Sequence, residues 1–473
     1  MARNLTDFWL YRYRYVIGYS IIGILLATLL VFAGLYVPGG LSSAEQASVV
    51  KTAGLDFSNP ATLFVTNLPY HLVQAFILET FGINDFTIKL LSLVIGLASA
   101  LGLIYLLRRW FPPSIAVLAS LIAVTTSQFL LIAQSGTPAV LYIFWPILLL
   151  LLGTQITRRN KARFFCMIVF TIIAALSLYT PLSIYILIAI GITVALHPHL
   201  RIAVRRLQKS QLVICAVIAL IILAPLLYGL FVNPTLWSEL LGLPTTWPDM
   251  MQNLETLLTQ YFFFWRPSAT TTLTPVFGLG SALLIGLGLY RLIRTSETTR
   301  SYLTISWVIC LLPVVLVNPS LITIVFLPSV LLLAAGLTSL IGYWYRLFPL
   351  NPYARVAGLI PIIVLVGVLL GSGVDRYVFS YHYSPDIADN YSRDLDLLPK
   401  ETQTLVVSTD EKPFYAAVAK YRPELTIVTT SPTAGAYVAT HAAATEQPTT
   451  AKVSRIITNS FKEHSDRFYL YKP

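Results

Sequence analysis

Eleven long apolar runs constrain this chain more than any other feature. A helix needs roughly 20 apolar residues to cross about 30 Å of hydrocarbon. Only 11% of the residues are charged, against about 25% in ordinary soluble domains, and the mean hydropathy is +0.73. We therefore predict an all-α polytopic membrane bundle of about 11 transmembrane helices, over residues 16–36, 88–107, 114–133, 139–157, 164–180, 181–197, 211–232, 275–293, 302–318, 320–342 and 356–373.

Basic residues give this bundle an orientation. Eighteen of them fall on one side of the eleven-span arrangement: Arg3, Arg12, Arg14, Arg108, Arg109, Arg158, Arg159, Lys161, Arg163, Arg201, Arg205, Arg206, Lys209, Arg291, Arg294, Arg300, Arg346 and Arg355. We assign this side to the cytoplasm, because cytoplasmic loops carry an excess of Lys and Arg. The opposite loops before residue 374 hold Lys51, Lys89 and Arg266. The N-terminus is thus predicted inside and the C-terminus outside, and the net charge of +11 requires no nucleic-acid partner.

The outer side holds the rest of the predicted organisation. Within a membrane domain of residues 1–373, two long outer loops cover 37–87 and 233–274, and the second contains an amphipathic stretch from Leu254 to Trp265. Charged residues become dense beyond residue 373, which predicts a small extracytoplasmic α/β domain over 374–473. Its expected elements are strands at 404–408 and 425–429, a helix at 413–421, a late edge strand at 468–471, and a loop or weak helix at 430–450.

Carboxylates are scarce in the membrane domain and gather at its outer rim. Seven of its nine acids lie outside: Glu45, Asp56, Glu79, Asp85, Glu239, Asp249 and Glu255. No ionisable residue lies near the middle of a predicted span, which argues against an ion-coupled carrier, since such carriers usually keep one there. The polar chemistry lies instead at the depth where a lipid-linked substrate presents its head group. Cys166, Cys215 and Cys310 are far apart in apolar runs, which predicts neither a disulfide nor a zinc site.

Five short motifs follow one another through the first outer loop and the second span. They are Leu41–Ala47, Asn67–His71, Leu78–Gly82, Lys89–Ser92 and Leu106–Phe111. Their order resembles the glycosyltransferase C superfamily, in particular the branch of protein O-mannosyltransferases and lipid A aminoarabinose transferase. Ser177–Leu182, Gly242–Pro244 and Tyr261–Trp265 resemble later parts of the same family.

The resemblance implies an inverting sugar transfer on the outer face of the cytoplasmic membrane. The donor would be a polyprenyl-phosphate-linked sugar with its tail in membrane lipid, and the acceptor an envelope glycan, lipid or protein. A first-loop acid would act as general base. The family has an Asp-Glu pair where this chain has Ala44 and Glu45, so Glu45 is the catalytic candidate. The missing acid motivates one alternative, a non-catalytic relative that binds a lipid-linked sugar; a transporter or flippase is another.

Six further side chains of the outer side are candidates for substrate binding: Lys51, Asp56, Tyr70, His71, Lys89 and Arg266. The cations suit a donor phosphate, although each could instead anchor the chain at the interface. His71 and Tyr70 could hydrogen-bond a sugar or cap the interface, Asp56 could be a turn residue, and Glu45 could simply follow an N-cap serine. A divalent ion needs several oxygen ligands, and the outer loops hold few clustered acids, so we expect no metal cofactor.

Overall fold

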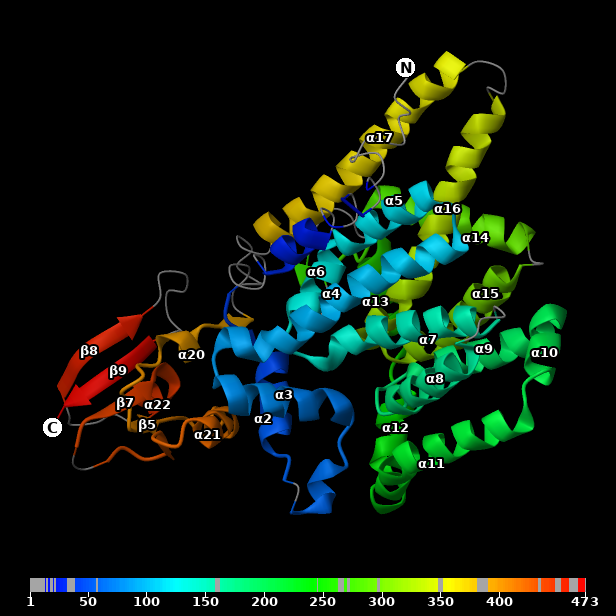
Figure 1. Cartoon of the computed structure of the whole chain (residues 1–473). Coiled ribbons are helices and arrows are strands. Elements are labelled where there is room, and N and C mark those ends of the chain that lie inside the picture. The colour runs from blue at the N-terminus through cyan, green and yellow to red at the C-terminus, as the bar shows by residue number, and fades with distance from the viewer. Residues whose placement is uncertain are drawn as a thin grey trace, which may run out of the picture.

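The computed structural model is a helical bundle with a small sheet domain at one end (Figure 1). It describes residues 13, 16, 17, 20, 23–31, 39–56, 58–157, 162–244, 246–262, 268–269, 273–295, 298–347, 352–380, 390–432, 435–446, 452–458 and 467–472. Every count or absence given below refers to this part of the chain.

Apolar helices occupy ten of the eleven predicted spans. They are α4 (Asp85–Trp110), α5 (Pro113–Val124), α6 (Ser127–Gln134), α7 (Leu141–Thr157), α8 (Arg163–Ser177), α9 (Ser183–Leu196), α11 (Lys209–Val232), α14 (Leu279–Arg294), α15 (Thr299–Val317), α16 (Phe326–Leu347) and α17 (Pro352–Asp375). Of the first predicted span, 16–36, residues 23–31 are helical and most of the others lie outside the described residues. Among the helices described, six can cross a membrane alone by length and composition, and two bent pairs raise this number to eight. The chain is therefore a multi-pass membrane protein.

Several predicted spans are not single straight helices. The span predicted over 114–133 breaks into α5 and α6, which meet at 65°, because the Thr126 hydroxyl accepts a hydrogen bond from the Phe129 amide and starts a new helix. Helix α9 bends by 96° into α10 (Pro198–Arg205), where Pro198 opens a short amphipathic helix. The span predicted over 320–342 begins as the 3-10 helix η4 (Pro319–Val325) before α16.

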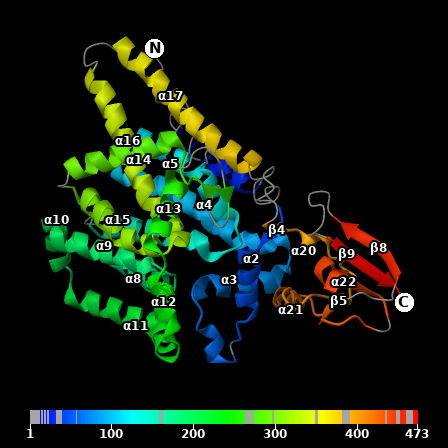
Figure 2. The same ribbon diagram turned by 180° about the vertical axis from the view of Figure 1, so that it is seen from behind.

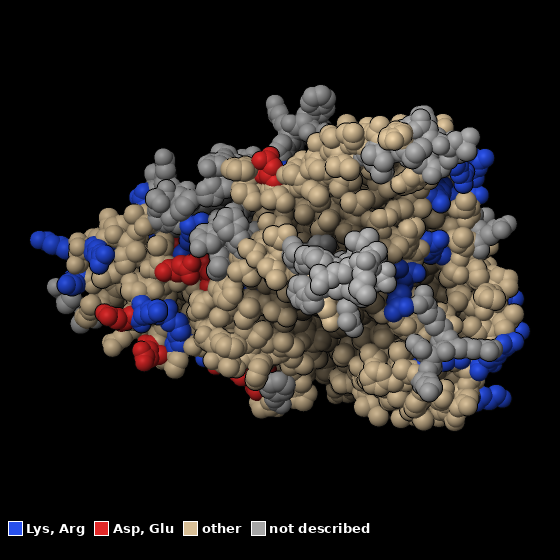
Figure 3. Space-filling view, turned by 45° about the horizontal axis from the view of Figure 1, so that its top comes forward, with Lys and Arg blue, Asp and Glu red and all other residues tan. Residues whose placement is uncertain are grey.

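Charge is distributed along the bundle as the predicted orientation requires. Basic residues lie near the helix ends that face away from the sheet domain, as in Arg108 and Arg109 of α4 and Arg291 and Arg294 of α14. In Figure 3, the far end of the bundle shows basic side chains and no acidic ones, whereas both acidic and basic side chains are visible toward the sheet domain. This separation agrees with a cytoplasmic surface opposite the sheet domain.

Two glycines let α14 and α16 pack backbone against backbone. A Cβ atom added to Gly288 would lie 1.8 Å from the carbonyl oxygen of Leu332, and one added to Gly336 would lie 1.9 Å from that of Leu284. Lipid tails are as apolar as leucine, so helices in a membrane gain stability from close packing at small residues. These two positions accept no side chain unless the helices move apart.

We expect Gly288→Val to separate α14 from α16 and to destabilise the protein by about 2 kcal/mol or more, as overpacking does. The measurement is thermal unfolding of the purified protein in detergent. Gly286→Val is the matched control, because a Cβ atom there meets nothing within 4 Å. Equal melting temperatures for the two variants would contradict this account of the crossing.

An outer layer covers the end of the bundle next to the sheet domain. It contains β1 (Leu41–Ser42), α2 (Ser43–Ala53), η2 (Pro60–Leu63), α3 (Leu68–Phe81), α12 (Thr235–Leu241) and α13 (Met250–Phe262). Helix α13 is the predicted amphipathic segment; Leu257 and Tyr261 pack against the core, and the Asn253 amide donates to two carbonyls at the end of α15.

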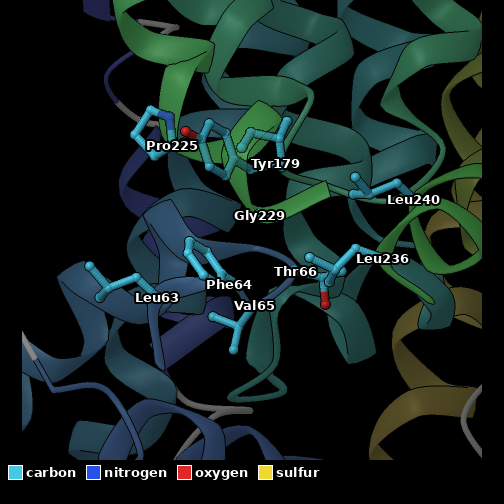
Figure 4. A pocket seen from close by; sticks show the side chains of 10 residues that line it. Leu63, Phe64, Val65, Thr66, Tyr179, Pro225, Gly229, Leu236 and Leu240 are labelled. Atoms are coloured by element: carbon cyan, nitrogen blue, oxygen red, sulfur yellow. The ribbon is translucent and has the colours of Figure 1, made fainter. Parts of the chain in front are cut away.

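A small apolar hollow of about 10 Å³ marks where the two outer loops meet. Phe64 and Thr66 of the first loop face Tyr179, Gly229 of α11, and α12 there (Figure 4). The backbone N–H of Asn67 donates to the Tyr179 carbonyl at 2.7 Å. Since the hollow has room for little more than one water molecule, we interpret it as a packing joint between the loops.

The C-terminal sheet has the order β6-β5-β7-β9-β8 and is mixed. The predicted strands are β5 (Thr404–Val406), β6 (Thr426–Val428) and β9 (Arg467–Lys472), and the predicted helix is α21 (Lys412–Tyr421). The late strand is not at an edge as predicted, because β8 (Lys452–Thr458) pairs with its outer side. The 430–450 segment, expected to be a loop or weak helix, holds the central strand β7 (Tyr437–Thr440) and the short helix α22 (His441–Glu446).

The sheet domain is joined to the outer layer by shared packing. Strand β1 pairs with β4 (Tyr391–Ser392), which precedes α20 (Asp394–Leu397), and Leu41 and Val49 belong to one apolar cluster with Leu405 and Phe414. Figure 2 shows α20 and α21 beside α2. The Lys420 ammonium donates to the Ala53 and Leu55 carbonyls at the end of α2, at 2.7 and 3.1 Å. The preceding helix α17 runs to Asp375, followed by a π-helical turn (Arg376–Ser380).

Candidate functional site

A cavity of about 530 Å³ lies where the outer layer meets the bundle. Its walls come from α2, the start of α3, the turn between α6 and α7, α7 itself, η4 and the segment at β4. The lining residues are Ser42, Ser43, Ala44, Ala47, Ser48, Lys51, Thr66, Asn67, His71, Leu131, Ile132, Ser135, Thr137, Pro138, Ala139, Tyr142, Ser320, Thr323, Asn390 and Tyr391. Hydroxyl and amide groups predominate among the polar ones, and the described lining includes no carboxylate.

One face of α2 supplies a wall of the cavity. Ala44, Ala47, Ser48 and Lys51 recur at helical spacing and all line it. Lys51 is an exposed residue that lines the cavity, and no acidic residue is among the lining residues. Ala44, where the resemblance puts the family aspartate, leaves this wall without a carboxylate.

His71 reaches the same cavity from α3 and is only 1% exposed. Its Nδ1 lies 2.8 Å from the Thr52 hydroxyl, which lies 2.6 Å from Oε1 of Gln74. Burial and, to a lesser degree, the Lys51 ammonium lower the pKa of His71 to about 4, because both disfavour the imidazolium. The ring is therefore neutral at pH 7.

Asn67 contributes a polar group without a protein partner. Its backbone is left-handed (φ 59°) at the N-cap of α3, and it lines the cavity. Its Oδ1 atom is buried and makes no hydrogen bond within the described structure. Buried polar atoms are nearly always paired, so this side chain is well placed to bind a polar ligand.

Glu45 lies behind the cavity wall and does not line it. Its carboxylate is fully buried and accepts hydrogen bonds from the Ser42 amide at 2.7 Å and the Gly136 amide at 2.6 Å. With the Ser42 hydroxyl it forms a capping box at the start of α2. The Lys89 ammonium is 3.9 Å away. These contacts stabilise the start of α2, and Glu45 is fully buried and is not among the lining residues of the cavity.

The other predicted residues fall into two groups. Lys89, 3% exposed, donates to the Gly40 carbonyl at 2.7 Å, and the Tyr70 hydroxyl bonds Ser92 at 2.8 Å; both are buried, and neither is a lining residue of the cavity. Burial raises the pKa of the Tyr70 phenol. Asp56 is exposed in a turn, where the hydroxyl and amide of Ser58 lower its pKa. Arg266 lies outside the described residues.

The structure brings two of the predicted residues, Lys51 and His71, to one cavity, and it adds Thr52, Gln74 and Asn67, which the sequence did not single out. A usable signal was the helical spacing of polar residues in apolar surroundings, Ser48 with Thr52 and His71 with Gln74. Within the described chain, no three His, Cys, Asp or Glu side chains come together as metal ligands would.

We expect Glu45→Ala to lower the free energy of unfolding by about 3 kcal/mol, since it leaves two buried amides unpaired and Lys89 without its counter-charge. Thermal unfolding in detergent measures this effect. Glu239→Ala, which removes an exposed outer-loop carboxylate, should leave the melting temperature nearly unchanged. If the two variants have the same melting temperature, the buried network around Glu45 does not stabilise the outer layer.

Comparison with known proteins finds a family profile that matches part of the chain and solved structures that share its fold. The profile of the dolichyl-phosphate-mannose-protein mannosyltransferase family matches residues 68–228, about a third of the chain. No curated protein sequence matches. The structure of ArnT from Cupriavidus metallidurans bound to undecaprenyl phosphate superposes with a TM-score of 0.54 at 12% identity, covering 96% of this chain and 98% of that one. Its apo structure gives 0.52 at 13% identity, covering 97% and 98%.

A second enzyme shares the arrangement over part of its length. The oligosaccharyltransferase AglB from Archaeoglobus fulgidus, in complex with an inhibitory peptide and a dolichol-phosphate, gives a TM-score of 0.52 at 14% identity. The match covers 87% of this chain and 64% of AglB. The chain therefore has the glycosyltransferase C fold, a helical membrane bundle with an extra domain at one end, as the resemblance implied.

Proposed function

We propose that this chain is a membrane glycosyltransferase that moves a sugar from a polyprenyl-phosphate donor to a hydroxyl of an envelope acceptor, on the outer face of the cytoplasmic membrane. The observation that carries the proposal is the 530 Å³ cavity at the outer end of the bundle, with the Lys51 ammonium in a wall of hydroxyl and amide groups. The fold that surrounds it is that of ArnT, which has been seen with undecaprenyl phosphate.

The chemistry of the lining suits such a donor. Lys51 would face the phosphate and offset the charge that grows on the leaving oxygen as the glycosidic bond breaks. Hydroxyl groups of Ser48, Ser135 and Thr137, with the unpaired Asn67 oxygen, would bind the sugar, which presents many donors and acceptors. The prenyl tail would remain in lipid beside the bundle.

A non-catalytic protein that binds the same lipid is the second candidate, and Ala44 favours it. The cavity wall lacks a carboxylate at the position where the resemblance places the catalytic acid. Reconstituted protein incubated with radiolabelled polyprenyl-phosphate sugars separates the two functions. Transfer of label to an acceptor supports the enzyme, whereas saturable donor binding without transfer supports the binding protein.

Replacing Lys51 tests the phosphate contact. We expect Lys51→Met to raise the Kd for the donor about tenfold, because a charge-assisted hydrogen bond is worth more than about 1.4 kcal/mol. Binding is measured by titration of labelled donor into protein in nanodiscs. Lys400→Met removes an exposed charge from the sheet domain and should leave Kd unchanged. An unaltered Kd in Lys51→Met would place the phosphate elsewhere.

We also propose that transfer requires no divalent cation, because Lys51 supplies positive charge in the cavity and its described lining offers no carboxylate ligand. Treatment with a chelator should leave the transfer rate within about twofold of the untreated protein. Loss of activity that magnesium or manganese restores would overturn this proposal. The assay is the same label transfer, with and without the added metal.

A further inference from the structure

The hydrogen bonds behind His71 determine which nitrogen of its ring carries the proton. The Gln74 amide nitrogen donates to the carbonyls of Ile88 and Gly136, at 3.2 and 3.5 Å, which turns its Oε1 toward Thr52. The Thr52 hydroxyl has two oxygen acceptors, Oε1 of Gln74 at 2.6 Å and the Ser48 carbonyl at 3.0 Å, and it donates its one hydrogen to the nearer, because two oxygens would otherwise meet at 2.6 Å without a hydrogen between them. Its own oxygen is left to accept from the His71 ring.

It follows that His71 carries its proton on Nδ1 and donates it to Thr52 over 2.8 Å. Nε2 then holds a lone pair, and it has no hydrogen-bond partner among the described residues. His71 is a lining residue of the cavity, as are Lys51 and Ala44. A neutral imidazole in this tautomer is the form that accepts a proton.

Burial first, and then the positive charge of Lys51, keep the His71 ring neutral. Lys51 on α2 shares the cavity with it, while Glu45 of α2 and Lys89 of α4 face each other behind the wall. The lining contributed by α6, η3 (Pro138–Val140), α7, η4 and residues 390–391 has no Asp, Glu, Lys or Arg, and its titratable groups are the phenols of Tyr142 and Tyr391. Tyr70 is buried and does not line the cavity. The pKa of about 4 leaves the basic form in place above pH 5 and removes it as the pH falls through 4.

We propose that His71 is the general base of the transfer, in the role that a carboxylate at position 44 would otherwise fill. This inference rests on the proposed transferase function. As the acceptor oxygen bonds to the anomeric carbon, its proton passes to Nε2 of His71. The bond from that carbon to the phosphate oxygen breaks, and its electron pair leaves on the phosphate, which Lys51 faces. The imidazolium then returns its proton to water. Thr52 and Gln74 are positioning residues.

His71→Asn isolates this function from folding. The asparagine amide nitrogen can take the place of Nδ1 and donate to Thr52, but nothing replaces Nε2. We expect kcat to fall by 10²–10⁴-fold, the usual contribution of a general base, while Kd for labelled donor stays within about threefold. Wild-type kcat in His71→Asn would overturn the assignment of His71 and leave the transferase standing. A wild-type protein that transfers no sugar would overturn both.

The pH profile provides a second test, and it does not require a substitution of His71 that still folds. The wild-type kcat/KM, which reports groups of the free protein, should be flat from pH 6 to 8 and fall only below about 5. In Lys51→Met the acid limb should move to higher pH, because the nearby positive charge no longer disfavours the imidazolium. The same limb in both proteins, or a wild-type limb near the ordinary histidine value of about 6.5, would overturn the proposal.

Discussion

The backbone of Gly136 hydrogen-bonds both helices of the outer layer that border the cavity, α2 and α3. Its N–H donates to Glu45 of α2, and its carbonyl accepts from Gln74 of α3. A side chain at Gly136 would collide with Ile88 at the start of α4, within 2.7 Å. In surroundings this apolar, an unpaired polar group is costly, so one turn between two membrane helices holds both outer helices in register. The cavity wall that they form is fixed by the bundle itself.

Hydropathy predicted the bundle well for a physical reason. A backbone in lipid must satisfy its hydrogen bonds internally, so an apolar run of this length has to be helical. What hydropathy cannot show is where a helix breaks, because Thr126 looks like any polar residue until its hydroxyl caps the next helix. The central strand β7 was not predicted, because its four residues lie among Ala and Thr and show little alternation of apolar and polar side chains. They form a strand because they pair with β5 and β9.

The site was predictable only in part. Lys51 and His71 stood out because ionisable residues are scarce on the outer side. The sequence did not show which face of α2 would line the cavity: successive residues of a helix point about 100° apart, so Ala44 lines it while Glu45 is buried and does not. The Thr52–Gln74 contact joins two helices, and no spacing within either helix indicates how the two will meet.

The pairing of β1 with β4 also has a consequence for biosynthesis. Helix α2, which carries Lys51, is made long before β4 and α21. Yet β1, which directly precedes α2, pairs with β4, and Lys420 of α21 contacts the end of α2. A chain is made from its N-terminus onward, and contacts of such sequence separation form late. The cavity therefore lacks the wall formed by Asn390 and Tyr391 until the segment that follows α17 has been made and has paired with the first outer loop.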